Sequence, residues 1–176
     1  MRIISGKYRH RIISWPDDQT NTRPTKDRVR EAVFSAIGDI SGLVVCDLYA
    51  GSGAMGIEAL SRDASFCYFV DIAPIALKTI KENLNTLSIP ASDYMVIARK
   101  DTDAIKFIEK NVDVLILDPP YKLGKYNEII DSCKDLLSEK HIIICESDHK
   151  LSFNELDYKK IKEYKYGETI VTILWK

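Results

Sequence analysis

The segment Ile-Leu-Asp-Pro-Pro-Tyr-Lys-Leu-Gly, residues 116–124, places a carboxylate, two prolines and a tyrosine at the end of an apolar run. A turn needs only one proline or glycine, and a carboxylate in this position must be solvated, paired or used. The chemistry that fits is a clamp for a flat ring carrying an amino group. Asp118 can accept a hydrogen from the amine, while the prolines lack amide hydrogens and can hold a main-chain carbonyl inward. Tyr121 offers a face on which a base can stack. Two acceptors on the amine would free its lone pair for methylation. The motif therefore predicts catalytic roles for Asp118, Pro119 and Tyr121, and a substrate contact for Pro120.

A glycine-rich motif, Asp-Leu-Tyr-Ala-Gly-Ser-Gly-Ala-Met-Gly at residues 47–56, follows the first apolar strand of the expected sheet. Gly51, Gly53 and Gly56 form the pattern G-x-G-x-x-G, and Asp71 ends the next apolar run. This is the dinucleotide-binding fingerprint, and a site for S-adenosylmethionine is built in the same way. Both ligands need glycines for a close backbone approach and an acid for the ribose hydroxyls.

The charge of Asp47 separates these two ligands. A pyrophosphate at a helix N-terminus is negatively charged, and a carboxylate just before the loop would repel it. S-adenosylmethionine instead carries a sulfonium cation and an amino group, which the carboxylate would favour. A third acid should contact the adenine amino group at the end of the third strand. Both Asp101 and Asp103 fit this place, and Asp103 could instead be a helix N-cap.

These motifs need a fold that brings them to one edge of a sheet. Apolar runs at 43–49, 66–71, 94–98, 112–118 and 141–147 read as strands, alternating with helices after Gly53 and over 74–87, 103–110 and 126–138. The end of the chain, around Gly167 and Glu168, reads as an antiparallel hairpin. We expect an α/β, Rossmann-like class I methyltransferase fold with a mostly parallel seven-stranded sheet, this C-terminal hairpin and an N-terminal β-hairpin extension. Ligands bind beyond the carboxyl ends of parallel strands, so Asp47 and Asp118 should face one cleft.

The N-terminal region is basic and differs from the rest of the chain. Residues 2–15 read as two short strands around Ser5-Gly6-Lys7, residues 16–24 as a loop, and residues 25–37 as a helix that Gly38 can cap. Residues 1–30 carry a net charge of +5, against −6 for the remainder. This asymmetry indicates a polyanionic partner. We expect residues 1–24 to be a basic hairpin and loop that binds RNA, and residues 25–176 the methyltransferase domain. Removal of residues 1–16 need not open the main core.

The bulk composition is that of a globular protein: the 176 residues are 45% hydrophobic and 29% charged. The longest apolar runs are shorter than the roughly 18 residues of a membrane span, and the first residues do not read as a secretory signal. The four cysteines are scattered, which favours reduced core thiols over disulfides or a metal site. We expect a cytoplasmic, monomeric protein with no metal and no membrane contact.

The sequence resembles the RsmD-type methyltransferases, which methylate the exocyclic N(2) amine of one guanine in bacterial 16S ribosomal RNA. The resemblance rests on MRIISGKYRHR (1–11), NTRPTKDRVREAVF (21–34), DLYAGSGAMGIEALSR (47–62), LDPPYKLGKY (117–126) and KYGET (165–169). It implies S-adenosylmethionine as cofactor, and 16S ribosomal RNA or the 30S subunit as partner. The implied cofactor contacts are Asp47, Tyr49, Gly51, Gly53, Asp71, Ile72, Asp118 and one or both of Asp101 and Asp103. The implied contacts to RNA or the target base are Lys7, Arg9, Arg11, Arg23, Pro24, Thr25, Pro120 and Tyr121. The family often has glutamate where Asp71 stands, and phenylalanine where Tyr49 stands.

Other functions fit parts of the pattern. A DNA adenine methyltransferase could use the same Asp-Pro-Pro-Tyr motif, and a protein glutamine methyltransferase uses a related one. A non-catalytic RNA-binding assembly factor would keep the fold with a vestigial pocket, but the intact Asp47, Gly51, Gly53 and Asp118 argue against it. An oxidoreductase that binds NAD is disfavoured by Asp47 and by residues 118–121.

Overall fold

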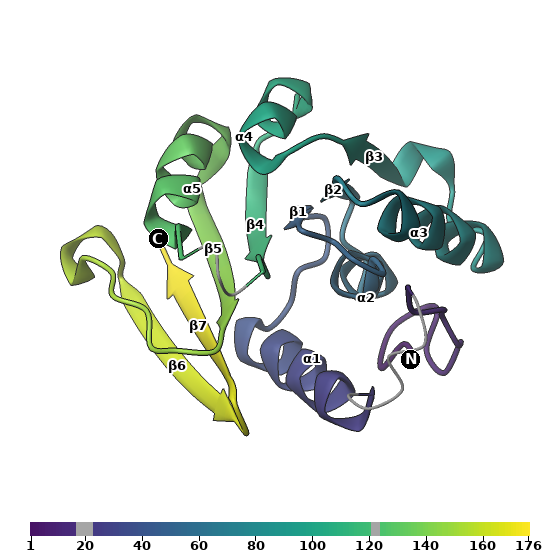
Figure 1. Ribbon diagram of the computed structural model, residues 1–176, viewed down its shortest axis with the longest axis horizontal. Helices are drawn as coiled ribbons and strands as arrows, with labels where there is room; N and C mark the ends of the chain where they lie inside the picture. The colour runs from purple at the N-terminus through teal and green to yellow at the C-terminus, as the bar shows by residue number, and fades with distance from the viewer. Residues whose placement is uncertain (17–22, 121–123) are drawn as a thin grey trace.

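The sheet of the protein has seven strands in the order β3-β2-β1-β4-β5-β7-β6 (Figure 1). The computed structural model describes residues 1–16, 23–120 and 124–176, and of residues 23–26 the backbone alone. Strands β1 to β5 pair in parallel, whereas β7 is antiparallel to β5 and β6. The strands are β1 (Val44–Leu48), β2 (Phe66–Asp71), β3 (Tyr94–Ala98), β4 (Val112–Leu117), β5 (Leu137–Ser147), β6 (Lys160–Tyr166) and β7 (Thr169–Trp175). The predicted mostly parallel sheet with a terminal antiparallel hairpin is confirmed.

Helices cover both faces of this sheet, as Figure 1 shows. Helices α1 (Arg23–Ile37), α2 (Ala54–Ser61) and α3 (Pro74–Thr86) pack on one face, and α4 (Asp101–Ala104) and α5 (Tyr126–Cys133) on the other. Short 3-10 helices lie at Ala91–Asp93, Ile105–Phe107, Lys134–Leu136 and Glu155–Asp157. No helix in the described part of the chain is long and apolar enough to span a membrane.

Alternation along the strands divides the core into two layers. On β4, Val114 and Ile116 face α1 to α3, whereas Leu115 and Leu117 face α4 and α5. Since both faces are covered, the central strands are apolar along nearly their whole length, as buried parallel strands must be. The cysteines belong to these layers, and all four are buried and free, which confirms the expectation of core thiols: Cys46, Cys67, Cys133 and Cys145.

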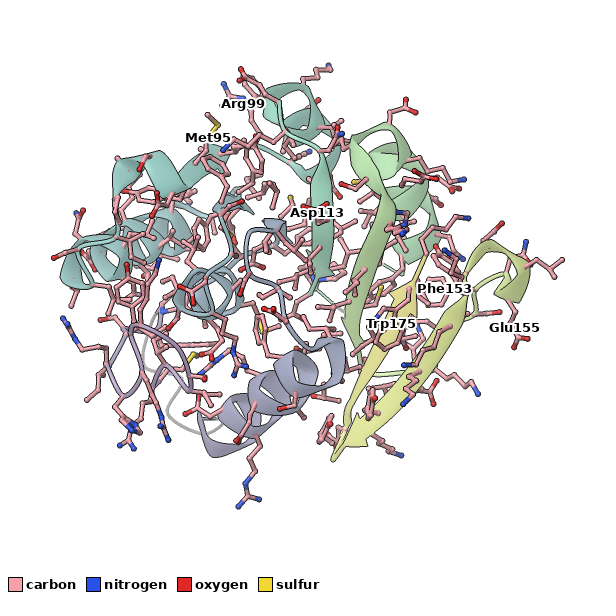
Figure 2. All side chains as sticks on the ribbon, turned by 180° about the vertical axis from the view of Figure 1, so that it is seen from behind. Met95, Arg99, Asp113, Phe153, Glu155 and Trp175 are labelled. Carbon is pink, nitrogen blue, oxygen red and sulfur yellow. The ribbon has the colours of Figure 1, made fainter. Side chains whose placement is uncertain are left out.

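The strand order creates one crevice. From β1 the chain builds outward through β2 to β3, and then returns to the other side of β1 to form β4. The connections after β1 and after β4 therefore leave the sheet in opposite directions, and ligands bind at such a switch point. At the opposite ends of these strands, the carboxylate of Asp113, seen on β4 in Figure 2, accepts hydrogen bonds from the Val44 amide (2.8 Å) and the Ser138 hydroxyl (2.5 Å). These bonds tie β1, β4 and β5 together at the ends that lie away from the crevice.

The N-terminal segment, residues 1–16, is less regular than predicted. The expected pair of strands is reduced to one antiparallel bridge, between Arg2 and Ile12. Ile3 and Ile13 are buried in the same core layer as α1 to α3. Gly6 has φ +79° and lies so close to α2 that a Cβ would meet the Ser61 carbonyl oxygen at 1.6 Å. The expectation that residues 1–16 can be removed without opening the core is therefore wrong.

A buried carboxylate on α2 holds this segment. Glu58 is 0% exposed and accepts hydrogen bonds from the amides of Ile4 (2.9 Å) and Ser5 (3.1 Å). It also pairs with Arg62 at 2.9 Å and with the buried Arg30 at 3.4 Å. Loss of one partner from such a group leaves an uncompensated buried charge, which typically costs about 3–5 kcal/mol. The N-terminal segment is thus an integral part of the domain.

Several predicted helix boundaries are corrected. The helix expected at 103–110 is one α-helical turn from Asp101 followed by a 3-10 turn that ends at Phe107. The helix expected at 126–138 ends at Cys133, and β5 already begins at Leu137. The predicted cap of α1 is confirmed, because Gly38 has φ +81° and donates to the Phe34 carbonyl at 3.2 Å.

Candidate active site

The buried acid at the end of β1 lies at the centre of the crevice. Asp47 is 2% exposed, and its Oδ2 accepts a hydrogen bond of 2.9 Å from the amide of Gly56 in the first turns of α2. Gly56 is required there because a Cβ would meet the Phe69 ring at 2.4 Å and the Cys67 sulfur at 2.6 Å. The absence of a side chain lets α2 approach β2, and this approach brings the amide to Asp47.

All three glycines of the G-x-G-x-x-G motif donate their amide hydrogens to acceptors within the protein. Gly51 donates to Asp71 Oδ2 at 2.9 Å, Gly53 to the Ala50 carbonyl at 2.7 Å, and Gly56 to Asp47. A pyrophosphate bound at a helix N-terminus uses such amides as donors. Here the amides are already engaged, and the acceptor at the helix is a carboxylate. The loop is therefore suited to a ligand without phosphate.

Asp71 joins the glycine loop to the end of β2. Its Oδ1 accepts from the amides of Ile72 (2.7 Å) and Ala73 (2.8 Å), and its Oδ2 from Gly51. A carboxylate has about four acceptor positions, so Oδ2 retains one for a ligand hydroxyl. The short side chain of Asp71 thus keeps its carboxylate close to the backbone. It still lines the main cavity of the protein, which lies at the carboxyl ends of the strands.

The two candidate acids after β3 have different surroundings. Asp101 lines the main cavity, accepts a hydrogen bond from the Tyr49 hydroxyl, and accepts another from the Thr102 amide at 2.8 Å. Asp103 is exposed and is absent from the cavity wall. It is not the N-cap of α4 either, because Lys100 occupies that position. The structure therefore brings Asp101, and not Asp103, to the site.

The main cavity has a volume of about 700 Å³. It lies at the carboxyl ends of the strands, and Ile72, 56% exposed, is the apolar side chain that follows Asp71 on its wall. Two basic residues after β3, Arg99 (labelled in Figure 2) and Lys100, also line it and were not predicted. Its lining residues are Leu48, Tyr49, Val70, Asp71, Ile72, Ala73, Arg99, Lys100, Asp101, Asp118, Pro119 and Pro120.

A second pocket of about 160 Å³ meets the main cavity at Tyr49 and Asp118, which line both. Tyr49 is a non-glycine residue with φ +68°, an uncommon conformation that often marks a functional site. The walls of the second pocket come from the N-terminal segment, α1, the end of β1, the glycine loop, the start of α2, the residue after β4, and β5. They are Met1, Trp15, Val29, Arg30, Asp47, Tyr49, Ala50, Gly51, Ser52, Ala54, Met55, Asp118 and Glu146.

Burial dominates the electrostatics of Asp47 and Tyr49. The pKa of Asp47 is raised from an ordinary value of 3.8 to about 7, mainly by burial and to a smaller extent by the negative charges of Asp118 and Asp71. The hydrogen bond from Gly56 acts in the opposite direction. Burial also raises the pKa of Tyr49, with a contribution from its bond to Asp101, so its phenol remains a donor. A cationic ligand would reduce the repulsion among the carboxylates of Asp47, Asp71 and Asp118.

The remaining predicted residues divide into two groups. Lys7 and Arg9 are exposed, whereas the Arg11 guanidinium donates to the Thr86 carbonyl at 2.9 Å, so Arg11 is partly engaged with α3. Tyr121 lies outside the described residues, as do the side chains of Arg23, Pro24 and Thr25. Within residues 1–16, 23–120 and 124–176, no group of three or more histidine, cysteine, aspartate or glutamate side chains could hold a metal ion.

Residues missed by the sequence reasoning are Arg99, Lys100, Trp15, Arg30 and Glu146. A signal existed for three of them, because Arg99, Lys100 and Glu146 come at or just after the carboxyl ends of predicted strands. Trp15 and Arg30 gave no such signal, since only the packing of the N-terminal segment against α1 and α2 brings them to the pocket.

Comparison with known proteins places the whole chain in one family. A family model described as "Conserved hypothetical protein 95" matches residues 1–175. The Bacillus subtilis (strain 168) protein named "Putative rRNA methyltransferase YlbH" is 37% identical over 183 residues, covering 100% of this chain and 99% of that protein. The "Ribosomal RNA small subunit methyltransferase D" of Escherichia coli (strain K12) is 32% identical over 154 residues, covering 84% and 75%.

Solved structures support the same fold. The structure described as "Putative methyltransferase yhhF from Escherichia coli" has a TM-score of 0.82 at 27% identity, covering 100% of this chain and 97% of that one. A more distant structure, "SMU.776, a putative methyltransferase complexed with SAH", has a TM-score of 0.66 at 16% identity, covering 85% and 49%. At that identity the likeness shows the fold alone.

The raised pKa of Asp47 predicts a pH-dependent stability cost. Between about pH 4 and pH 7 the unfolded chain has lost this proton and the folded chain retains it, so folding stability falls as the pH rises through this window. Asp47→Asn removes the charge but keeps an acceptor for Gly56. We expect the free energy of unfolding of this variant, relative to wild type, to rise by up to about 4 kcal/mol between pH 4 and pH 8.

Urea unfolding at both pH values measures this difference. The same change at the exposed Asp135 is the matched control, and its pH profile should run parallel to that of wild type. A parallel profile for Asp47→Asn as well would show that the buried carboxylate carries no such cost.

Proposed function

The chain belongs to the RsmD-type methyltransferase family, and from this premise we propose that it transfers a methyl group from S-adenosylmethionine to the exocyclic N(2) amine of a guanine in 16S ribosomal RNA. The observation that carries the proposal is the glycine loop. Its three glycine amides are engaged within the protein, and its acceptor at the helix is the buried Asp47. This arrangement favours a cationic ligand over a pyrophosphate.

The residues of the crevice fit the parts of S-adenosylmethionine. Asp71 has an acceptor position left for a ribose hydroxyl, and Ile72 offers an apolar surface to the adenine. Asp101, which lines the main cavity, would accept a hydrogen bond from the adenine amino group. Asp47, with the backbone at Gly51 and Gly53, would hold the methionine end. When bound, the cofactor supplies an electrophilic methyl group on a sulfonium cation.

Asp118 and Pro119 would receive the target amine. Both line the main cavity, and Asp118 also faces the second pocket, so an amine bound there meets the carboxylate at the junction of the two. The lone pair of an aromatic amine is delocalised into the ring, and acceptors on its hydrogens favour a tetrahedral nitrogen. Since the methyl donor is already charged, positioning should provide most of the rate. The proposed stacking of the base on Tyr121 remains a prediction.

The alternative functions gain less support. The pyrophosphate of NAD would need free amide donors in the loop, whereas the amides of Gly51 and Gly56 donate to carboxylates of the protein. A non-catalytic assembly factor would have no reason to retain a buried Asp47 at a cost in stability. The relatives named as rRNA methyltransferases favour RNA over DNA adenine or a protein glutamine as the substrate.

The basic N-terminal segment would hold the RNA beside the crevice. Lys7 and Arg9 are exposed on it, and its ends, Met1 and Trp15, line the second pocket. A target base must be unstacked and flipped to reach Asp118. We propose residues 1–24 as the RNA-binding extension, either naked 16S RNA or an assembling 30S subunit as the partner, and a monomer acting in the cytoplasm.

Methyl transfer tests the function directly. Labelled S-adenosylmethionine is incubated with small-subunit RNA, and separately with 30S particles, from a strain that lacks the enzyme. Nucleoside analysis should then find N(2)-methylguanosine at one position. Asp118→Ala should lower transfer by about 100-fold or more, because the amine loses its acceptor, while cofactor affinity stays nearly unchanged. Label in another nucleoside, or in protein, would refute the proposed substrate.

The RNA-binding role of the N-terminal segment predicts a change in salt dependence. Removing one basic side chain that pairs with a phosphate should reduce the slope of log affinity against log salt by about one unit. The double change Lys7→Ala, Arg9→Ala should therefore weaken RNA binding most at low salt, with a slope shallower by about two units. The melting temperature should barely move, because both side chains are exposed.

The matched control removes two exposed lysines from the edge strand β6, Lys162→Ala and Lys165→Ala, for the same change in net charge. This variant should bind RNA as wild type does. Equal slopes for all three proteins would refute an RNA-binding role for Lys7 and Arg9 and leave the methyltransferase proposal intact.

A further inference from the structure

The sheet register places a second carboxylate beside Asp118. In the parallel pairing of β4 with β5, Ile116 is opposite Ile144 and Leu117 is opposite Cys145. One step further, Asp118 comes opposite Glu146, at the spacing of about 4.8 Å that separates neighbouring strands. Glu146 is half-buried, and both acids line the second pocket.

Both carboxylates lie on the face of the sheet that α1 and the N-terminal segment cover. Ile116 and Ile144 belong to the core layer on that face, and side chains two residues further along a strand return to the same side. Asp47 is opposite Ile116 on β1 and lies on this side too. In Figure 1 the arrowheads of β4 and β5 point toward α1. The second pocket therefore has its acids on the sheet side and Trp15 and α1 on the other.

We propose that the target guanine enters the second pocket from the main cavity, with its ring against Trp15 and its amine-bearing edge at Asp118 and Glu146, and that Glu146 is a specificity-determining residue whose carboxylate accepts the N1 hydrogen of the base. This inference rests on the proposed function. Asp118 takes the neighbouring N(2) amine, so the two acids read two adjacent donors on one edge of the ring. The Asp47 and Gly51 side of the same pocket is left for the methionine end of the cofactor.

Guanine is the base that matches this pair of acceptors. Its N1 carries a hydrogen next to the exocyclic amine, whereas adenine and cytosine carry an unprotonated ring nitrogen beside theirs. A carboxylate opposite that nitrogen would lose its donor and face a lone pair. Sites that hydrogen-bond a substrate group discriminate strongly against analogues without it, because the buried acceptor is left unpaired.

Trp15 supplies the flat surface that such a base needs. It lies on the wall of the same pocket as Glu146, and aromatic stacking tolerates every base. Stacking therefore holds the flipped ring, and the two carboxylates decide which ring is accepted.

The test removes from the base the N1 hydrogen that Glu146 is inferred to accept. The guanine located by the transfer experiment is replaced by 2-aminopurine, which keeps the N(2) amine but has no hydrogen on N1 and no oxygen on C6. For the wild-type protein, kcat/KM for RNA with guanine at this position should be about 100-fold higher than kcat/KM for RNA with 2-aminopurine. In Glu146→Gln the ratio should fall below about 10-fold, because an amide can turn its N–H toward the unprotonated N1. Cofactor affinity, measured by calorimetry, should be the same in both proteins.

Glu139→Gln is the matched control, since it makes the same change at an exposed position on the same strand, and it should keep the wild-type ratio. RNA rebuilt by the same route with guanine must be methylated by wild type; if it is not, the proposed function fails first. Wild type that methylates both bases equally would overturn the inference without any variant. An unchanged ratio in Glu146→Gln, with weaker cofactor binding, would place Glu146 at the cofactor instead.

Discussion

The hydrogen bond between the Asp47 carboxylate and the Gly56 amide is the constraint on which the rest of the site depends. It requires α2 to follow β1 after the short glycine loop of residues 49–53 and to approach β2 so closely that residue 56 has no room for a side chain. This close packing buries the carboxylate, which raises the pKa of Asp47 to about 7. The protein thus retains a group that is costly for folding at neutral pH, as expected where a ligand of opposite charge provides the compensation.

Side chains on α2 and α3 connect the proposed RNA-binding segment with the proposed cofactor loop. Asn83 on α3 is buried, accepts from the Ser14 amide at 2.7 Å, and donates to the carbonyls of Ser14 and Ser52 at 3.0 Å. It therefore joins the N-terminal segment to the glycine loop, while Glu58 fixes that segment to α2. The proposed RNA-binding surface and the proposed cofactor loop share one support, so neither can shift without disturbing the other.

Much of this arrangement was predictable because strand alternation and strand ends follow simple rules. The order of strands and helices placed Asp47, Asp71 and Asp118 at one edge, and the structure finds them lining the two adjoining pockets. The choice of Asp101 over Asp103 was not predictable, since it depends on where one short helix begins. The packing of Ile3 and Ile13 was missed because an alternating apolar pattern does not reveal which element it covers. Glu146 requires the register between strands that are distant in sequence, and residue spacing along the chain does not give that register.

The central claim is that the crevice at the switch point binds a cation with a carboxylate that must first lose its proton. Calorimetric titration with S-adenosylmethionine and with NAD, at pH 5.5 and pH 8, tests it most directly. The account predicts that S-adenosylmethionine binds more tightly at pH 8 than at pH 5.5, because its affinity should fall by up to about tenfold for each pH unit below 7. It also predicts that NAD shows no comparable binding at either pH. Tight binding of NAD without binding of S-adenosylmethionine would contradict the account.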